Sequence, residues 1–275
     1  MIPLLSLLAC DPKGEEDLLE VSIPFTATVA GEDFACGTTY PGLGTTGVTI
    51  DPQDLRLYVY DVALIDASGE AVAVALDQDR TWQYQNLALL DFEDGTGACA
   101  TGSPDTHTAV TGTVPRGDYQ GLTFMVGVPT AFNHLDAATA PAPLNDPGLW
   151  WAWTSGFKYA RIDVGTGNNP AFYFHLGATD CAQAEDGSYS CTLDNLPAVT
   201  LADFVLDADA VNIDLARLYA GNDLEAPVDY VTDFVSGCMA FAGDPECEAM
   251  LGTLGLPWGD ATVAPEQTLF ALEAL

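Results

Sequence analysis

Short segments of alternating apolar and polar residues recur along this chain, and glycine, proline or aspartate separates each from the next. Val21, Ile23 and Phe25 open one such segment, and residues 55–65 alternate over a longer stretch. Alternation with a period of two puts one row of side chains on a buried face, which is typical of a β-strand. Further segments of this kind cover residues 87–92, 108–114, 119–128, 157–164, 171–177, 199–206 and 211–215.

About nine strands with their own turn signals predict an all-β protein: a single antiparallel β-sandwich-like domain with long loops over residues 21–275. Helical periodicity is confined to residues 230–239 and 245–254, which predicts one or two short C-terminal helices. Asp244 could cap the second helix, with Pro245 at its first position. Residues 129–156 lack periodicity and are rich in Pro, Ala and Trp. A loop of that length in a compact domain usually serves a function.

The N-terminus has the pattern of a bacterial lipoprotein. Leu7-Leu8-Ala9-Cys10 places a small residue directly before a cysteine, after an apolar run too short to span a bilayer. We therefore expect residues 1–9 to be a residual signal segment and residues 10–20 to be a lipidated Cys10 with a polar tether. A lipid anchor, rather than a spanning helix, would hold the protein at the bacterial cell envelope. The alternative is a buried N-terminal strand with an incidental cysteine.

Six cysteines remain when Cys10 is set aside. An even remainder in an exported chain favours disulfides. Two pairs are close in the sequence and would close short loops, which leaves a third pair; the expected bonds are Cys181–Cys191, Cys238–Cys247 and Cys36–Cys99. The rival interpretation is a thiolate metal site, but the chain has no CxxC pair.

The chain is strongly acidic, with 7 basic and 40 acidic residues and a formal net charge of −33. Nucleic acid is excluded as a partner, because phosphate binding requires clustered Lys and Arg. Recognised catalytic motifs such as HExxH, GxSxG and a P-loop are absent from the sequence. We therefore expect a binding protein and not an enzyme.

Only three histidines are present, so each can be weighed separately. His107 follows a polar, turn-like stretch and is expected at the surface. His134 lies at the start of the long aromatic loop, and His175 lies in an alternating segment on the face that it shares with Tyr173. Taken alone, each histidine is more commonly structural than a ligand.

Tryptophan is the second unusual feature. Trp150, Trp151 and Trp153 lie almost side by side in the long loop, and Trp82 lies in an earlier segment. Composition alone favours a hydrophobic plug at one end of the sandwich.

Together, these segments resemble the MbnP family, also described as metallo-mystery pair four-Cys motif proteins. The resemblance covers residues 34–255 and depends on the order and number of its motifs. They include Phe34-Ala35-Cys36, Asp54-Leu55-Arg56-Leu57-Tyr58, Gly127-Val128-Pro129, Asn133-His134, Trp151-Ala152-Trp153, His175-Leu176-Gly177 and Asp244-Pro245-Glu246-Cys247.

The resemblance implies an extracytoplasmic protein that binds one copper ion. It further implies a partner, a diheme enzyme similar to MauG and bacterial cytochrome c peroxidases, that oxidises a tryptophan to kynurenine near the copper. By position, His134 and His175 are the implied ligands. The candidates for oxidation are Trp151 and Trp153, followed by Trp82.

Neutral imidazole suits both copper states, and Asp136 is a candidate to orient His134 from outside the coordination sphere. Two alternatives stay open. One is a metal-free structural or adhesive surface lipoprotein whose tryptophans form a plug. The other is an enzyme that turns over a substrate with copper.

Overall fold

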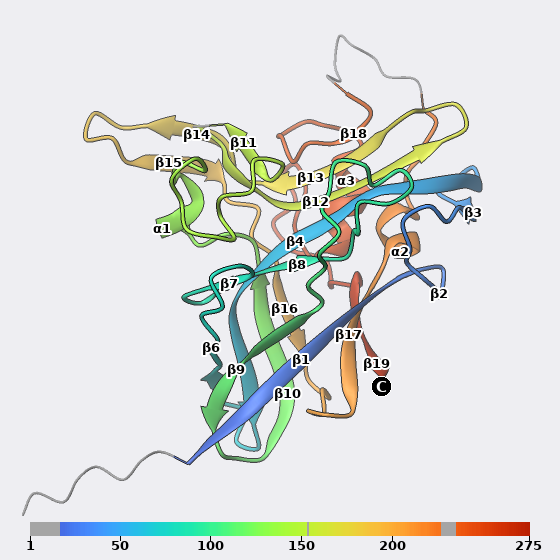
Figure 1. Ribbon diagram of the computed structural model, residues 1–275. Helices are drawn as coiled ribbons and strands as arrows, with labels where there is room; N and C mark the ends of the chain where they lie inside the picture. The colour runs from blue at the N-terminus through green and yellow to red at the C-terminus, as the bar shows by residue number, and fades with distance from the viewer. Residues whose placement is uncertain (1–16, 153, 227–234) are drawn as a thin grey trace, which may run out of the picture.

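Two β-sheets and a separate hairpin form this protein, whose computed structural model describes residues 17–152, 154–226 and 235–275 (Figure 1). The first sheet has the strand order β19-β17-β1-β9-β6, with β2 paired to β1. Its strands are β1 (Leu18–Val29), β2 (Glu32–Asp33), β6 (Ala75–Leu76), β9 (Ala109–Pro115), β17 (Asp209–Asp214) and β19 (Phe270–Ala274).

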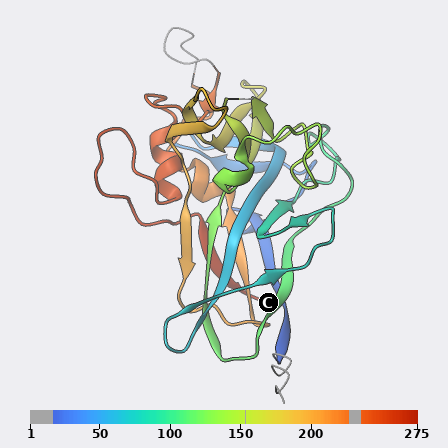
Figure 2. The ribbon, with the colours of Figure 1, turned by 90° about the vertical axis from the view of Figure 1, so that its left-hand side faces the viewer.

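The second sheet is built around one long strand, β4, which runs through the length of the molecule (Figure 2). The main order is β16-β10-β4-β12-β13-β18, and β3, β5, β7, β8 and β11 attach at its sides. Its strands are β3 (Tyr40–Leu43), β4 (Val48–Asp66), β5 (Ala71–Ala73), β7 (Gln83–Tyr84), β8 (Leu87–Asp91), β10 (Tyr119–Val126), β11 (Trp150–Ala152), β12 (Gly156–Thr166), β13 (Phe172–Gly177), β16 (Ala198–Leu201) and β18 (Gly237–Cys238).

Aromatic side chains join the two sheets. Phe25 of β1 and Phe270 of β19 both make edge contacts with Phe124 of β10, at centroid distances of 5.6 and 5.4 Å. All three rings are buried. Edge-to-face geometry is favourable for aromatic pairs, so this contact stabilises the packing of one sheet on the other.

The all-β prediction is confirmed, but the sheets are mixed and not purely antiparallel. The pairs β1–β17 and β13–β18 are parallel. The two partners in each pair come from distant parts of the chain, and a parallel pair requires such a long crossover. The expected strand over residues 211–215 ends at Asp214, whose side chain accepts a hydrogen bond from Ala216 N–H and caps the helix that follows.

Three short helices are present among the described residues: α1 (Thr130–Asn133), α2 (Leu215–Tyr219) and α3 (Cys247–Thr253). The last lies inside the helix expected over residues 245–254, but it begins later than expected. Asp244 is not its cap; its carboxylate accepts hydrogen bonds from Met239 N–H and Glu246 N–H instead. The helix expected over residues 230–239 is wrong at its C-terminal end, where Gly237 and Cys238 pair with β13 as strand β18.

The remaining elements are β14 (Thr179–Gln183) and β15 (Tyr189–Leu193), which form a two-stranded hairpin beyond the end of β13. Within the described part of the chain, no helix is long and apolar enough to cross a bilayer. The expected signal segment and the expected lipidation site, Cys10, lie outside the described residues.

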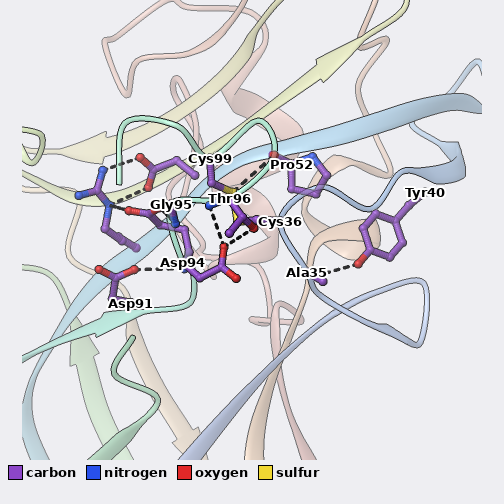
Figure 3. The surroundings of a disulfide bond; sticks show 12 residues. Ala35, Cys36, Tyr40, Pro52, Asp91, Asp94, Gly95, Thr96 and Cys99 are labelled. Atoms are coloured by element: carbon purple, nitrogen blue, oxygen red, sulfur yellow. Dashed lines mark hydrogen bonds and ion pairs between the residues drawn. A yellow bond between two sulfur atoms is a disulfide. The ribbon is translucent and has the colours of Figure 1, made fainter. Parts of the chain in front are cut away.

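Three disulfides link the pairs that the cysteine spacing indicates: Cys36–Cys99, Cys181–Cys191 and Cys238–Cys247. The first fastens the loop after β8 to the N-terminal segment (Figure 3). Cys99 Sγ lies 3.6 Å from the carbonyl oxygen of Pro52 in β4, and Ala35 N–H donates to the Tyr40 hydroxyl on the other side of the bond. This disulfide therefore holds the loop after β8 and the segment between β2 and β3 beside the central strand, β4.

Candidate metal centre

His175 is held in one orientation by a buried carboxylate. It lies on β13 with 7% of its surface exposed, and its Nε2 is 3.0 Å from Asp163 Oδ1 on the neighbouring strand β12. An ionised carboxylate only accepts hydrogen bonds, so Nε2 carries the proton and the lone pair is on Nδ1. The pair therefore leaves Nδ1 as the atom of His175 that can bind a metal.

Burial favours this neutral ring. Burial lowers the pKa of His175, and the bond to Asp163 only partly offsets that effect. Burial alone would raise the pKa of Asp163, but the hydrogen bond from His175 and the charge of Arg161 outweigh it and lower that pKa. A neutral imidazole beside an ionised carboxylate is the usual arrangement of a metal-binding histidine and its outer partner.

Trp151 lies against His175. The two rings meet edge to face with centroids 6.2 Å apart, and Phe241 packs on Trp151 at 5.5 Å. Gly177, two residues after His175, makes room for the indole: a Cβ there would fall 3.1 Å from Trp151 Cζ3. Strand β11 brings Trp151 to this position by pairing with the start of β12.

A network of buried ion pairs extends from Asp163 into the second sheet. Arg161 Nε lies 2.8 Å from Asp163 and 3.2 Å from Asp54. Asp54 in turn pairs with Arg56, whose guanidinium also lies 2.7 Å from Asp146. Asp54 and Arg56 are almost completely buried, and a buried charge is tolerated only when it is paired in this way.

The far end of this network holds two further carboxylates. Glu93 lies 3.6 Å from Arg56 and is completely buried. Burial, followed by the charge of Glu93, raises the pKa of Asp91 to about 7. Asp91 and Arg56 line a cavity of about 290 Å³ together with Trp82.

His134 has a different environment. It follows α1, is half-buried, and stacks on Tyr189 of β15 at a centroid distance of 4.3 Å. Its Nε2 lies 3.8 Å from Cys191 Sγ. The preceding residue, Asn133, fixes this position by accepting a hydrogen bond from Phe157 N–H on β12.

Both candidate ligands lie on elements at one end of the second sheet: His175 on β13, which leads into the β14–β15 hairpin, and His134 after α1, which lies beside that hairpin (Figure 1). Their contacts differ: His175 touches Asp163 and Trp151, and His134 touches Tyr189 and Cys191.

A family model described as MbnP matches residues 19–240 of this chain. The chain belongs to the MbnP family. A solved structure, MbnP from Methylosinus trichosporium, matches with a TM-score of 0.83 and 28% sequence identity, over 94% of this chain and 99% of that one. No curated protein matches.

In the MbnP fold, the tryptophans that the sequence left as candidates for oxidation have different surroundings. Trp82 lies parallel to His107 at a centroid distance of 5.3 Å, and His107 Nδ1 is 2.6 Å from the Leu89 carbonyl oxygen. His107 is thus half-buried and packed, not a free surface residue as expected. Trp151, by contrast, contacts a candidate ligand directly. Trp153 lies outside the described residues.

The expected role of Asp136 toward His134 stays a prediction. Asp136 is half-buried, and its Oδ1 accepts a hydrogen bond from Ala138 N–H within its own turn. Sequence reasoning missed the carboxylate that orients the other histidine, Asp163, and the stacking partner of His134, Tyr189. One signal for the first was available: Arg56 and Arg161 are two of only seven basic residues, and both fall inside apolar strands.

Proposed function

We propose that this MbnP-family protein binds one copper ion at the bacterial cell envelope through the imidazoles of His134 and His175. In this proposal a diheme partner, similar to MauG and cytochrome c peroxidases, oxidises a neighbouring tryptophan to kynurenine. The protein acts as a copper carrier or store and not as an enzyme. A lipid on Cys10 would anchor it to the membrane.

The observation that carries the proposal is the contact set of His175. Nε2 is held by Asp163, so Nδ1 is the ligand atom, and Trp151 lies edge-on beside the same ring. A carboxylate bonded to the outer nitrogen of an imidazole raises its basicity and fixes its direction. His134, half-buried at the same end of the sheet, supplies a second imidazole, a donor that copper binds well.

Trp151 is the tryptophan that we assign to oxidation. An indole offers a metal only a weak π face, whereas kynurenine carries an aniline nitrogen and a ketone that can bind. The change would be useful only beside the metal, and the ring of Trp151 lies against a candidate ligand. Trp82 touches His107 instead and lies beside the Arg56 cavity.

The test combines copper titration with peptide mass mapping. We expect one tightly bound copper per wild-type protein and loss of tight binding in His134→Ala and in His175→Ala. The matched control is His107→Ala, which removes the third histidine and should leave copper binding unchanged. Wild-type affinity in both ligand variants would contradict the proposal.

Mass mapping tests the tryptophan. After incubation with the diheme partner and peroxide, we expect the kynurenine mass on the peptide that contains Trp151 in wild type and in Trp82→Phe. In Trp151→Phe the same peptide, which still contains Trp150 and Trp153, should no longer gain that mass. An unmodified protein without bound copper would instead favour a metal-free structural or adhesive surface lipoprotein.

A further inference from the structure

We propose a second, redox-gated metal site in which reduction of the Cys181–Cys191 disulfide frees two thiolates beside His134. The three side chains would then bind a soft or borderline cation such as Cu(I) or Zn(II). This inference goes beyond the proposed copper site, with which it shares only His134, and it does not involve His175.

The geometry brings one nitrogen and two sulfurs together. The ligand atoms of His134, Cys181 and Cys191 all lie within 4.8 Å of one another, and Nε2 of His134 is 3.8 Å from Cys191 Sγ. The two cysteines are directly opposite each other in the β14–β15 ladder, so the hairpin keeps both sulfurs close even without the bond between them. Two thiolates and an imidazole are a common protein ligand set for Zn(II), and thiolates favour Cu(I).

Accessibility distinguishes this disulfide from the other two. Both sulfur-bearing residues of the hairpin are partly exposed, whereas Cys238 and Cys247 are completely buried. In the remaining pair, Cys36 is partly exposed but Cys99 is completely buried. The hairpin also projects from the end of the second sheet (Figure 1). A dithiol can approach an exposed disulfide directly, and accessible bonds are the ones that exchange.

The position of His134 already suits metal binding in the reduced protein. Tyr189, two residues before Cys191, stacks on its ring, and Asn133 ties the adjacent backbone to β12. Neither contact depends on the bond between the sulfurs. The imidazole should therefore stay beside the cysteines when that bond opens.

The redox step balances with a dithiol as reductant. The Cys181–Cys191 bond breaks and takes up two electrons and two protons, and the dithiol becomes a disulfide. When the metal binds, the two thiols release their protons to solvent, and thiolates coordinate. Reoxidation by a disulfide acceptor reforms the bond and releases the ion.

The experiment uses the apo protein, with Co(II) as a probe whose thiolate charge-transfer absorption reports sulfur ligation. Dithiothreitol reduces the protein and is removed by anaerobic gel filtration, the free thiols are mapped by alkylation, and Co(II) is added. We expect Cys181 and Cys191 to be the first cysteines alkylated, and the charge-transfer band to appear only after reduction. His134→Ala should weaken Co(II) binding by about 10–100-fold or more.

Two variants separate this site from the proposed copper site. His175→Ala should lose tight copper binding in the oxidised protein yet keep the Co(II) band after reduction. The double variant Cys181→Ser/Cys191→Ser should lose the band. Because Tyr189 still stacks on His134 in this variant, it should bind copper as the oxidised wild-type protein does, and its circular dichroism should match wild type.

The inference is overturned if the alkylation labels another cysteine pair first, if the reduced protein binds Co(II) without the band, or if the band persists in the double serine variant. None of these results would affect copper binding by the oxidised protein. Failure of the second site is therefore distinguishable from failure of the first.

Discussion

The two histidines at the candidate metal centre are held in opposite ways. His175 is buried in the second sheet and bonded to Asp163, at the end of a chain of ion pairs that reaches Arg56. His134 lies half-buried against a hairpin, where an aromatic ring and a disulfide are its neighbours. The comparison shows that one candidate ligand is held by a buried carboxylate, whereas the other is placed by a hairpin that contains a disulfide.

The largest expected effect concerns the ion-pair network on the His175 side. Arg56→Met would leave three carboxylates, those of Asp54, Glu93 and Asp146, without their shared cation. Removing one partner of a buried pair should lower the free energy of unfolding by about 3–5 kcal/mol. Urea denaturation measures the change.

Arg116→Met is the matched control for that change. Its ion pair with Asp17 is largely exposed, so the loss should be at most about 1 kcal/mol. If Arg56→Met and Arg116→Met lower the free energy of unfolding equally, the buried ion-pair network is no more stabilising than an exposed ion pair.

The next prediction compares the carboxylates that lie near the two candidate ligands, His175 and His134. Asp163→Asn removes the charge that orients His175, so copper affinity should fall about 10–100-fold. Asp136→Asn, in the turn after His134, should have a smaller effect, because Asp136 Oδ1 already accepts a hydrogen bond from Ala138 N–H. Selective ¹⁵N labelling of the three histidines gives an independent readout, because wild-type His175 should carry its proton on Nε2. A larger effect for Asp136 than for Asp163 would reverse our assignment.

A pH experiment compares the interior with the hairpin. The raised pKa of Asp91, about 7, means that the folded state binds more protons than the unfolded state between about pH 4 and 7. Wild-type stability from this group therefore falls as pH rises through that range. Asp91→Asn should gain stability relative to wild type, on the order of 2–3 kcal/mol, between pH 5 and pH 8.

Asp186, in the hairpin turn, provides the opposite case. A hydrogen bond from Ser188 lowers its pKa, so its contribution is fully present above the unfolded pKa and is lost only in acid. The effect of Asp186→Asn should hence be the same at pH 5 and pH 8 in urea denaturation. If the stability difference between Asp91→Asn and wild type does not change with pH, the raised pKa of Asp91 is contradicted.

The smallest effect tests the stacking of His134. Tyr189→Leu removes an aromatic contact worth about 0.5–1.5 kcal/mol, so copper affinity should fall about 2–10-fold. Tyr189→Phe keeps the ring and should retain wild-type affinity in the same titration. If both variants bind copper like wild type, the stack does not position His134.

Much of the fold follows from local patterns in the sequence. Alternation in residues 21–29 identifies β1, whose inward-facing side chains are buried. Alternation in residues 55–65 also identifies β4, although both faces of that strand are largely buried. The parallel pairing of β1 with β17 could not be predicted, since the partners lie far apart in the chain and nothing local encodes their direction.

The site was predictable only in part. Histidine is scarce in this chain, and this scarcity singles out His134 and His175. The contact of Asp163 with His175, however, depends on the register of β12 and β13, where Asp163 lies opposite Tyr173. Among 40 acidic residues, the one local signal that marks Asp163 is the basic Arg161, two positions earlier in an apolar strand. The placement of Tyr189 likewise depends on how the hairpin folds back toward α1.

The most direct test of the central claim is to count imidazoles on the bound copper. Pulsed electron paramagnetic resonance of the Cu(II)-loaded, oxidised protein detects the remote nitrogen of each coordinated ring. Our account predicts two imidazoles in wild type and one on the copper that His134→Ala and His175→Ala still bind weakly at high copper concentration. A single imidazole in wild type, or a count unchanged by His175→Ala, would contradict it.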